Sequence, residues 1–378
     1  MSTSISIKEL KELDPSSYQI VDIRDAVEIS HGAIPGALVM KTEKIETSDA
    51  IDRSKKTIIC CSRGRFSVAA AEELQEKGWD AVSLEGGYIA WLMDVMSAPE
   101  EQDKAADVEK SLRKKFKKSI WSKFTKAINT YELVKPGDKI AVCISGGKDS
   151  MLMAKLFQEL KRHNKFPFEL VFLVMDPGYN EANRAVIEHN AKLLGIPITV
   201  FETEIFDAVY NVEKSPCYLC ARMRRGYLYS KAKELGCNKI ALGHHYDDVI
   251  ETILMGMLYG AQVQTMMPKL HSTNFEGMQL IRPMYLIREA DIKHWRDYND
   301  LHFIQCACKF TDTCTTCRTD GTSVSKRMEI KNLIAELKKV NPHIESNIFR
   351  SVENVNLHTV IAYKKDGVKH SFLEGYDD

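Results

Sequence analysis

The sequence lacks any long apolar run, and this absence argues against a membrane protein. No apolar stretch approaches the ~20 residues that a membrane-spanning helix needs. Met1 to Leu13 also lack the apolar core of a secretory signal and carry Lys and Glu side chains instead. Collagen, coiled-coil and low-complexity compositions are absent as well, since 44% of the 378 residues are hydrophobic and 28% are charged. We therefore expect a cytoplasmic globular protein of two or three domains, with no membrane partner.

Net charge is lacking overall, because 52 basic side chains balance 52 acidic ones. The two signs are nevertheless unevenly spread along the chain. Residues 1–103 hold 11 basic and 19 acidic side chains, whereas residues 104–126 hold nine basic and only two acidic ones. An acidic first part followed by a basic second part predicts that the second part meets a polyanion.

Cysteines are present in number, and their grouping favours metal, cluster or thiol chemistry over disulfides. Eight of the ten fall into three groups, namely Cys60/Cys61, Cys217/Cys220 and Cys306/Cys308/Cys314/Cys317. Cys143 and Cys237 stand alone in apolar surroundings, so we expect these two thiols to pack in the core.

The chain divides at a charged segment that lacks apolar periodicity, Ser97 to Asp107. We predict a first domain at residues 1–96, a linker at 97–109, a second domain at 110–355 and a C-terminal extension at 356–378.

Both domains show alternating strand and helix patterns, which predict α/β folds. The first has buried strand patterns at Tyr18–Ile23 and Thr57–Cys61 and a helical pattern at Ser67–Lys77, so its sheet is expected to be largely parallel. The second opens with an apolar residue at every fourth position from Leu112 to Ile128, which predicts a helix. Its later strand patterns alternate with helices, which predicts a doubly wound, mainly parallel sheet.

A Gly-rich turn between a strand and a helix forms the first candidate site, made of Ser145, Gly146, Gly147, Lys148, Asp149 and Ser150. Glycines let backbone N–H groups turn toward an anion, the helix N-terminus adds partial positive charge, and Lys148 adds a full charge. The spacing differs from a Walker A loop, which has four residues between its first glycine and Gly-Lys. The segment resembles the PP-loop of ATP pyrophosphatases, which implies an adenine nucleotide alpha hydrolase-like fold and cleavage of ATP between its α and β phosphates.

Three further motifs extend the resemblance over residues 110–355. They are Cys217-Tyr-Leu-Cys-Ala-Arg-Met-Arg-Arg-Gly226, Ala241-Leu-Gly-His-His-Tyr-Asp-Asp248 and Ile281-Arg-Pro-Met-Tyr-Leu-Ile-Arg-Glu289. In this order and spacing they are similar to those of the tRNA 2-thiocytidine synthetase family. The resemblance implies tRNA and ATP as substrates and allows a homodimer.

The resemblance also implies a 4Fe-4S cluster held by Cys217, Cys220 and one distant cysteine, with an iron left open for the sulfur in transfer. Cys306 fits the distant position when counted from Arg288, although Cys308, Cys314 and Cys317 remain alternatives. The competing interpretation is a structural zinc site made by the four thiolates Cys306, Cys308, Cys314 and Cys317. Cys217 and Cys220 would then form a redox or persulfide pair.

Carboxylates are expected around the triphosphate, because Mg²⁺ prefers one or two carboxylates together with phosphate oxygens. The resemblance points to Asp149 and Asp247 as metal ligands and to Asp149 and Asp248 as catalytic residues. It also implies that Asp176, Gly243 and His244 help to bind ATP, besides the Gly-rich turn. The alternative is that these aspartates only cap helices or lie in ordinary loops.

A second thiol site follows a strand at Cys61-Ser-Arg-Gly-Arg-Phe66. A loop that leads into a helix presents N–H groups, and Arg63 and Arg65 add positive charge, so the loop favours a thiolate or persulfide. Residues 1–96 resemble single-domain rhodaneses, which makes Cys61 the nucleophile and Cys60 the end of the strand. The six-residue loop implies sulfur chemistry, since related phosphatases have a loop one residue longer. The alternative is an inactive rhodanese fold used for docking.

Basic side chains at two places in the second domain are candidates for tRNA phosphates. Lys114 and Lys115 lie in the basic helix, and Arg222, Arg224 and Arg225 follow the C-x-x-C pair. The alternative for the helix is a solvated basic face.

Together these features predict a rhodanese-like domain fused to an ATP-dependent tRNA thiolase that forms 2-thiocytidine. Cys61 would carry the sulfur as a persulfide, supplied by an upstream donor such as a cysteine desulfurase, and hand it to the open iron of the cluster. Cys61 and the cluster ligands Cys217 and Cys220 are therefore the predicted catalytic cysteines. Two alternatives stay open. One is the same chemistry at another nucleotide, giving a 2-thiouridine-type product, and the other is a zinc-stabilised sulfur carrier that binds ATP without a cluster.

Overall fold

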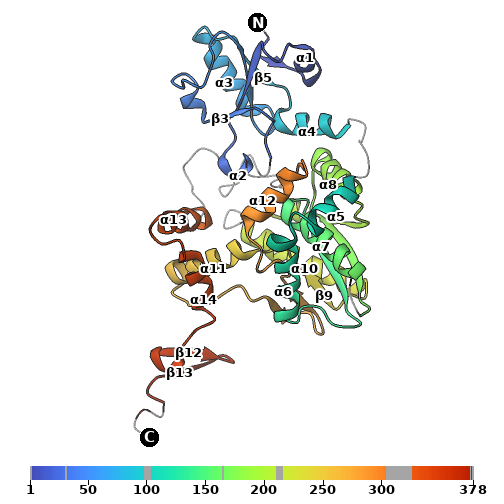
Figure 1. Ribbon diagram of the computed structural model, residues 1–378, viewed down its shortest axis with the longest axis vertical. Helices are drawn as coiled ribbons and strands as arrows, with labels where there is room; N and C mark the ends of the chain where they lie inside the picture. Colours follow the sequence, from blue (N-terminus) through green and yellow to red (C-terminus); the bar gives the residue numbers. More distant parts are fainter. Residues whose placement is uncertain are drawn as a thin grey trace. The chain divides into compact units, whose positions relative to one another are not determined.

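Two sheets of five and six strands organise the protein, and a two-stranded hairpin lies near its C-terminal end (Figure 1). A computed structural model describes residues 2–29, 32–97, 104–163, 166–209, 216–303, 326–374 and 376. The described chain forms two compact units. The first runs to His245 and resumes at Pro268, and the second holds the intervening residues together with everything described from Lys326 onward. The predicted domain at 110–355 is thus shared between the two units.

The N-terminal sheet has five strands in the order β1-β5-β4-β2-β3, all parallel to their neighbours. The strands are β1 (Ser4–Ile5), β2 (Tyr18–Asp22), β3 (Leu38–Val39), β4 (Lys56–Cys60) and β5 (Ala81–Leu84). The helices are α1 (Ile7–Glu12), α2 (Ala26–Ile29), η1 (Thr42–Lys44), α3 (Arg65–Glu76) and α4 (Gly87–Ser97). The predicted largely parallel α/β fold of this domain is confirmed, with strand ends shifted by one residue.

The second sheet has six strands in the order β10-β11-β9-β6-β7-β8, and only β10 runs antiparallel to its neighbour. Its strands are β6 (Lys139–Ile144), β7 (Glu169–Asp176), β8 (Ile198–Glu202), β9 (Lys239–Ala241), β10 (Lys269–His271) and β11 (Gln279–Ile281). Side chains of β6 alternate between the faces. Ile140, Val142 and Ile144 share a core with helix α7 (Lys148–His163), whereas Ala141 and Cys143 pack with helix α10 (Pro216–Glu234). Helices on both faces confirm the doubly wound fold.

The remaining helices of this unit are α5 (Lys104–Arg113), η2 (Lys117–Trp121), α6 (Ser122–Thr130), α8 (Glu181–Leu193), α9 (Ile205–Val209) and α12 (Glu289–Tyr298). Helix α5 begins inside the range 97–109 that the sequence presents as a linker, and its Val108 is buried. Cys143 and Cys237 are buried as predicted, and burial raises the pKa of the Cys143 thiol to about 12. Such a thiol is inert at neutral pH, as expected for a core residue.

The predicted helix over Leu112–Ile128 forms, but a wider turn interrupts it at η2. The apolar residues at four-residue spacing are all buried. An α-helix has 3.6 residues per turn, so a row with a spacing of four drifts by about 40° at each step. The N–H of Trp121 donates to the oxygen of Phe116, five residues earlier, and this π-type turn returns the row to the core.

The second unit contains α11 (Tyr246–Gly260), α13 (Lys326–Val340), α14 (Ile344–Ser351), η3 (Leu357–Thr359) and the hairpin β12 (Ala362–Lys365)–β13 (Val368–Ser371). Among the described residues, no helix is both long enough and apolar enough to cross a membrane.

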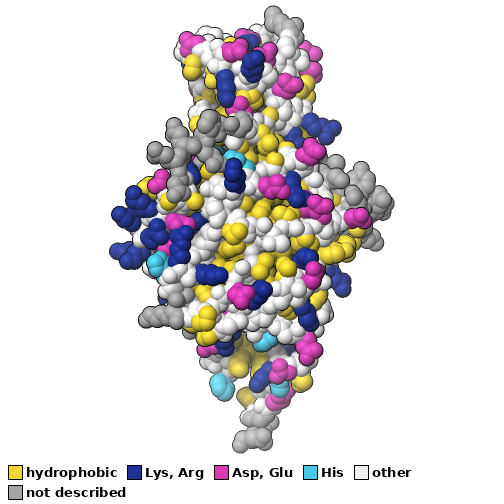
Figure 2. All heavy atoms as spheres, turned by 90° about the vertical axis from the view of Figure 1, so that its right-hand side faces the viewer, with side chains coloured by type: hydrophobic (Ala, Val, Ile, Leu, Met, Phe, Trp, Pro, Cys, Tyr) yellow, Lys and Arg dark blue, Asp and Glu magenta, His cyan; other side chains and the backbone are white. Residues whose placement is uncertain are grey.

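The face of the molecule in Figure 2 carries acidic, basic and apolar side chains side by side, and Lys and Arg side chains form one dense group on it.

Candidate functional site: a Gly-rich anion loop and two thiol positions

The turn between β6 and α7 has the geometry of an anion cradle. Gly146 has φ +86°, a left-handed conformation that glycine adopts without strain. The hydroxyl of Ser150 accepts a hydrogen bond of 3.1 Å from the N–H of Ser145 and donates one of 3.0 Å to the oxygen of Gly147. Ser150 therefore closes the turn, and the 16-residue helix α7 starts within it, at Lys148. Its first N–H groups are available for phosphate oxygens.

Lys148 is nearly enclosed, at 2% exposure, and its charge is balanced by two carboxylates. Its Nζ lies 3.1 Å from Asp149 Oδ2 and 3.5 Å from Glu289 Oε1. Lys293, one turn along α12, places its own Nζ 3.3 Å from the same Glu289 oxygen. The motif that ends at Glu289 was recognised in the sequence, but the role of this carboxylate was missed, because only the tertiary structure brings it to Lys148.

One carboxylate oxygen of Asp149 lacks a hydrogen bond within the described part of the chain. Its Oδ1 is buried and has no hydrogen-bond partner among the described residues, and His245 Nε2 is 4.0 Å away. An unsatisfied carboxylate oxygen beside an anion cradle suits a cation, and the hard oxygen ligand suits Mg²⁺.

The ends of the two neighbouring strands complete this edge of the sheet. Strand β6 lies between β7 and β9, and Asp176 ends β7 while Gly243 and His244 follow β9. The strand order reverses on either side of β6, and ligands of open α/β sheets bind at such a switch point. A Cβ at Gly243 would lie 3.3 Å from the carbonyl carbon of Asp149, so glycine permits this close approach.

Asp176 and His244 are engaged within the protein. The Asp176 carboxylate accepts hydrogen bonds from the N–H groups of Gly178 and Tyr179 and from Arg184 Nη1. Burial acts to raise the pKa of Asp176, but these hydrogen bonds outweigh burial and lower it. His244 Nδ1 accepts a hydrogen bond of 3.3 Å from Arg282 Nε. Asp176 therefore shapes the loop after β7 as an ionised carboxylate.

Asp247 and Asp248 open α11 and belong to the second unit. Asp248 Oδ1 lies 2.5 Å from Arg327 Nη1, and the same guanidinium is 3.5 Å from Glu251 Oε2. The guanidinium of Arg327, which the sequence did not single out, therefore holds one oxygen of Asp248.

The C-x-x-C pair lies in the first turn of α10, where residues three apart share a helix face. The side chain of Cys220 is half-buried and packs against the small apolar cluster that contains Met175, near the end of β7. The side chain of Cys217 and all of Cys306, Cys308, Cys314 and Cys317 lie outside what the structure describes. The described thiol thus lies against the same strand whose last residue is Asp176.

The predicted tRNA-binding residues are mostly solvated. Arg222 and Arg225 are exposed, and Arg224 Nη2 is 3.4 Å from the hydroxyl of Tyr179. Lys114 and Lys115 are exposed in the basic segment between α5 and η2. These positions are open to a polyanion.

The thiol of Cys61 follows β4 and faces two hydroxyls. Its Sγ lies 3.3 Å from the oxygen of Ser67, which lies 2.8 Å from the oxygen of Ser83. A Cβ at Gly87 would lie 2.2 Å from the carbonyl oxygen of Cys61, so the loop closes only against glycine. Burial raises the pKa of the neighbouring Cys60 thiol far above its usual range. Cys60 is therefore a poor nucleophile, as expected for the end of a strand.

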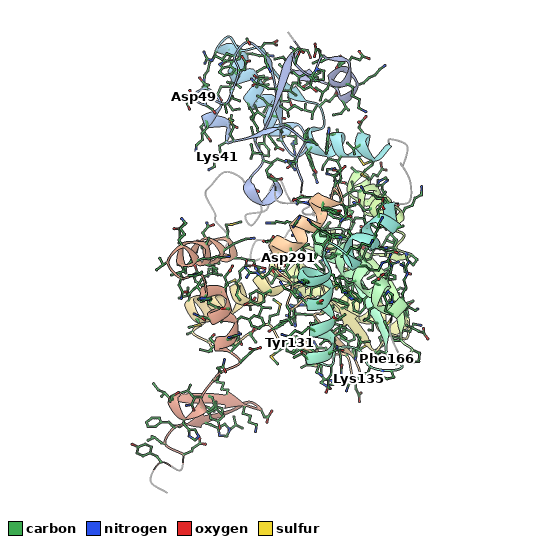
Figure 3. All side chains as sticks on the ribbon, viewed as in Figure 1. Lys41, Asp49, Tyr131, Lys135, Phe166 and Asp291 are labelled. Carbon is green, nitrogen blue, oxygen red and sulfur yellow. The ribbon has the colours of Figure 1, made fainter. Side chains whose placement is uncertain are left out.

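A surface cavity of about 420 Å³ lies elsewhere, beside α6 and α7. Its lining includes Lys135 and Phe166, both labelled in Figure 3. None of the predicted site residues lines this cavity, so it is separate from the anion cradle.

Comparison with protein families finds two domains in the chain. A PP-loop domain matches residues 114–310, and a rhodanese-like domain matches residues 6–94. The tRNA-cytidine(32) 2-sulfurtransferase of Syntrophotalea carbinolica is 35% identical over 263 residues, covering 68% of this chain and 96% of that protein. The enzyme of the same name from Geobacter sulfurreducens is 33% identical over 241 residues, covering 63% and 90%.

A solved structure, the U34-tRNA thiolase NcsA from Methanococcus maripaludis with its 4Fe-4S cluster, aligns with 64% of this chain and 80% of its own. The identity is 22% and the TM-score 0.48, which does not by itself establish a shared cofactor. The family of this chain instead follows from the two domain matches and from the coverage of 96% and 90% of the two relatives. The chain belongs to the tRNA-cytidine(32) 2-sulfurtransferase family of PP-loop proteins and carries a rhodanese-like domain ahead of its PP-loop domain.

Proposed function

We propose that this protein is an ATP-dependent tRNA thiolase that forms 2-thiocytidine at position 32 of its tRNA substrates. The observation that carries the proposal is the 35% identity over 96% of a tRNA-cytidine(32) 2-sulfurtransferase. The anion cradle at the switch point of the sheet supports the ATP-dependent half of the reaction. The protein acts on tRNA in the cytoplasm, and a homodimer is compatible with the proposal.

In the first step the C2 oxygen of cytidine attacks the α-phosphorus of ATP. The bond from that phosphorus to the bridging oxygen breaks, and pyrophosphate leaves with the electron pair. Lys148 and the N-terminus of α7 are proposed to hold the phosphates, and Asp149 and Asp247 are the proposed Mg²⁺ ligands. The buried Asp149 Oδ1, which has no hydrogen-bond partner among the described residues, supports this role. Ser145, Gly146, Gly147 and Ser150 shape the cradle. Asp176, Gly243 and His244 line the adjoining strand ends, and Asp248 is a proposed catalytic carboxylate.

Sulfur then displaces AMP from C2. We assign the cluster ligands to Cys217, Cys220 and Cys306, because the two helix positions share one face and thiolates are the ligands that iron–sulfur clusters take. When bound, the cluster supplies an open iron that can hold the sulfur. Cys220 packs against the apolar cluster of Met175 and Ile205, which makes one side of this proposed site apolar.

The rhodanese-like domain supplies the sulfur as a persulfide. The Cys61 thiolate attacks the sulfane sulfur of a persulfide donor such as a cysteine desulfurase, a new S–S bond forms, and the donor thiolate leaves. On delivery a nucleophile takes the outer sulfur, Cys61 leaves as a thiolate, and a thiol reductant provides the two electrons that bring the sulfur to the sulfide level. Fusion to the acceptor domain raises the effective concentration of this donor to roughly millimolar.

Mass spectrometry of tRNA nucleosides from cells with and without the gene tests the proposal. Loss of 2-thiocytidine in the deleted strain is the expected result. Loss of a different thionucleoside, such as one of the 2-thiouridine type, overturns the choice of base while keeping the chemistry. An unchanged nucleoside profile overturns the proposed function.

Anaerobic purification tests the cluster separately. We expect brown protein whose iron content falls when Cys217 or Cys220 is replaced by Ser. A colourless protein that carries zinc, lost on replacing Cys314 or Cys317, would instead favour the sulfur-carrier alternative.

A further inference from the structure

An aromatic contact joins the rhodanese-like domain to the PP-loop domain within the first compact unit. Helix α4 packs against α8, and the Trp91 ring on α4 meets the His302 imidazole edge-on at a centroid distance of 5.3 Å. The carbonyl oxygen of His302 accepts a hydrogen bond of 2.9 Å from Nδ2 of Asn190 on α8. One side chain of the rhodanese-like domain therefore touches a residue that is anchored to the sheet domain.

The same contact leads back to the sulfur-carrying loop. The Tyr88 ring stacks on Trp91 at 5.5 Å, and the N–H of Tyr88 donates a hydrogen bond of 2.8 Å to the carbonyl oxygen of Cys61. The Arg24 guanidinium covers the Tyr88 ring at 3.7 Å. A continuous series of contacts thus runs from Cys61 through Tyr88 and Trp91 to His302.

The contact is tightly packed around Gly32. A Cβ at Gly32 would lie 2.6 Å from the Tyr88 hydroxyl oxygen and 3.6 Å from His302 Nδ1. Both of these polar atoms are buried without a hydrogen-bond partner in the part of the chain that is described. Two unsatisfied polar atoms weaken an interface, so the attraction here rests mainly on the aromatic packing.

On the other side, His302 belongs to the segment that follows α12. Phe303, the next residue, is buried and stacks on Trp295 of α12 at 6.3 Å. The first residue of α12 is Glu289, whose carboxylate lies 3.5 Å from the PP-loop Lys148. The docking contact and the ATP site are therefore attached to the two ends of one ten-residue helix, about 15 Å long.

We propose that Trp91 and His302 form the docking contact that holds the rhodanese-like domain in place for handing sulfur from Cys61 to the PP-loop domain. This inference rests on the proposed function, and it adds that delivery occurs through a specific interface rather than through a flexible tether alone. Large aromatic side chains at the centre of an interface commonly carry most of its binding energy. Truncating Trp91 therefore removes the contact between the domains but leaves them covalently linked.

The test uses the full-length Trp91→Ala variant and three rate measurements. The first is transfer of sulfur from thiosulfate to cyanide, which needs only the Cys61 loop. The second is tRNA thiolation fed with excess hydrosulfide, which bypasses Cys61. The third is thiolation fed only by a persulfide donor at limiting sulfur. We expect the first two rates to stay at the wild-type level and the third to fall by about tenfold, since tethering without docking remains.

Trp79→Ala is the matched control, because Trp79 packs in the separate core on the other side of the N-terminal sheet. It should leave the third rate unchanged, whereas His302→Ala should reproduce the loss from the opposite side of the contact. Trp91→Phe should restore most of the rate, because a ring is retained. A wild-type third rate in Trp91→Ala overturns the docking contact. An unchanged third rate in Cys61→Ala overturns instead the sulfur route of the proposed function.

Discussion

At the scale of the residue, the two adjacent cysteines of the rhodanese-like domain have different environments. Cys60 is fully buried, and its raised pKa keeps the thiol protonated at neutral pH. Cys61 follows the strand and faces the hydroxyl of Ser67. Cys61 is also buried, at 4% exposure, but it belongs to the loop rather than to the strand, and it is the proposed sulfur carrier.

We therefore expect Cys61→Ala to abolish persulfide formation, whereas Cys60→Ala should leave it intact. Mass spectrometry of the intact protein after incubation with a persulfide donor measures the adduct. A persulfide that persists in Cys61→Ala and vanishes in Cys60→Ala would reverse the assignment.

Lys148 gives a second prediction at this scale. Its ammonium is buried between Asp149 and Glu289, and a buried charge depends strongly on its partners. Glu289→Gln should lower the rate of pyrophosphate release by about tenfold, corresponding to ~1.4 kcal/mol, because the ammonium loses one of its two carboxylates. The matched control is Glu181→Gln, an exposed position at the start of α8. Equal rates in both variants would show that Glu289 does not position Lys148.

Exposed lysines give a third prediction. Lys114 and Lys115 are both solvated, so contacts with tRNA phosphates would be electrostatic and sensitive to salt. Replacing both by Ala should weaken tRNA binding and reduce the slope of log affinity against log salt by about 1 to 2. Filter binding across a salt series gives the slope. An unchanged slope would show that these lysines do not contact tRNA phosphates and would favour the alternative, a solvated basic face.

At the scale of the element, Gly243 and Gly226 differ in the space that surrounds them. A Cβ at Gly243 would meet the carbonyl carbon of Asp149 at 3.3 Å, whereas nothing lies within 4 Å of a Cβ at Gly226 in α10. Gly243 lies close against the backbone of the Gly-rich turn, whereas Gly226 has no such neighbour.

We expect Gly243→Ala to weaken ATP binding, because the segment after β9 must shift away from the PP-loop. Gly226→Ala should raise the free energy of unfolding by about 0.5–1 kcal/mol, as alanine stabilises helix interiors. Nucleotide titration and thermal unfolding of both variants separate the two effects. Wild-type ATP affinity in Gly243→Ala would refute the packing argument.

The helices also show where periodicity predicts structure and where it does not. The apolar row Leu112–Ile128 correctly predicted the buried face, but the π-type turn at Lys117–Trp121 was missed. Its cause is the mismatch between a spacing of four and a helical period of 3.6, which is relieved only once the row has a core to face.

At the scale of the whole molecule, His302 makes stability depend on pH. Burial lowers its pKa, Arg296 and Lys104 act in the same direction, and Asp300, with Oδ1 3.3 Å from His302 Nε2, acts against them. A histidine whose pKa is lowered in the folded state contributes stability above its unfolded pKa of about 6.5 and loses it as the pH falls further.

Wild-type protein should therefore lose stability relative to His302→Phe on going from about pH 8 to about pH 5. Thermal unfolding of both proteins across this range measures the difference. The neighbouring Tyr88 stays neutral throughout, since burial raises its pKa to about 12. A difference that does not change with pH would show that His302 titrates alike in the folded and unfolded states.

The two sheets and the family could be predicted because each depends on patterns of residues close together in the sequence. Alternating strands and helices predicted both sheets, and Ser145–Ser150 and Cys217–Cys220 indicated the family that the comparisons confirm. The site residues assigned to ATP, metal, cluster and tRNA stay predictions. Burial of Cys143 and Cys237 also followed from their apolar neighbours in sequence.

The sequence by itself determined the fold class, the Gly-rich turn and the pairing of a rhodanese-like domain with a PP-loop domain, because these depend on residues close together along the chain. Only the tertiary structure decided that Glu289 neutralises Lys148, that Arg327 holds Asp248 and that Trp91 meets His302. Such contacts join residues about 80 to 210 positions apart. They exist only after the sheet and its helices have packed, since contacts so distant in sequence form at the cost of closing long loops.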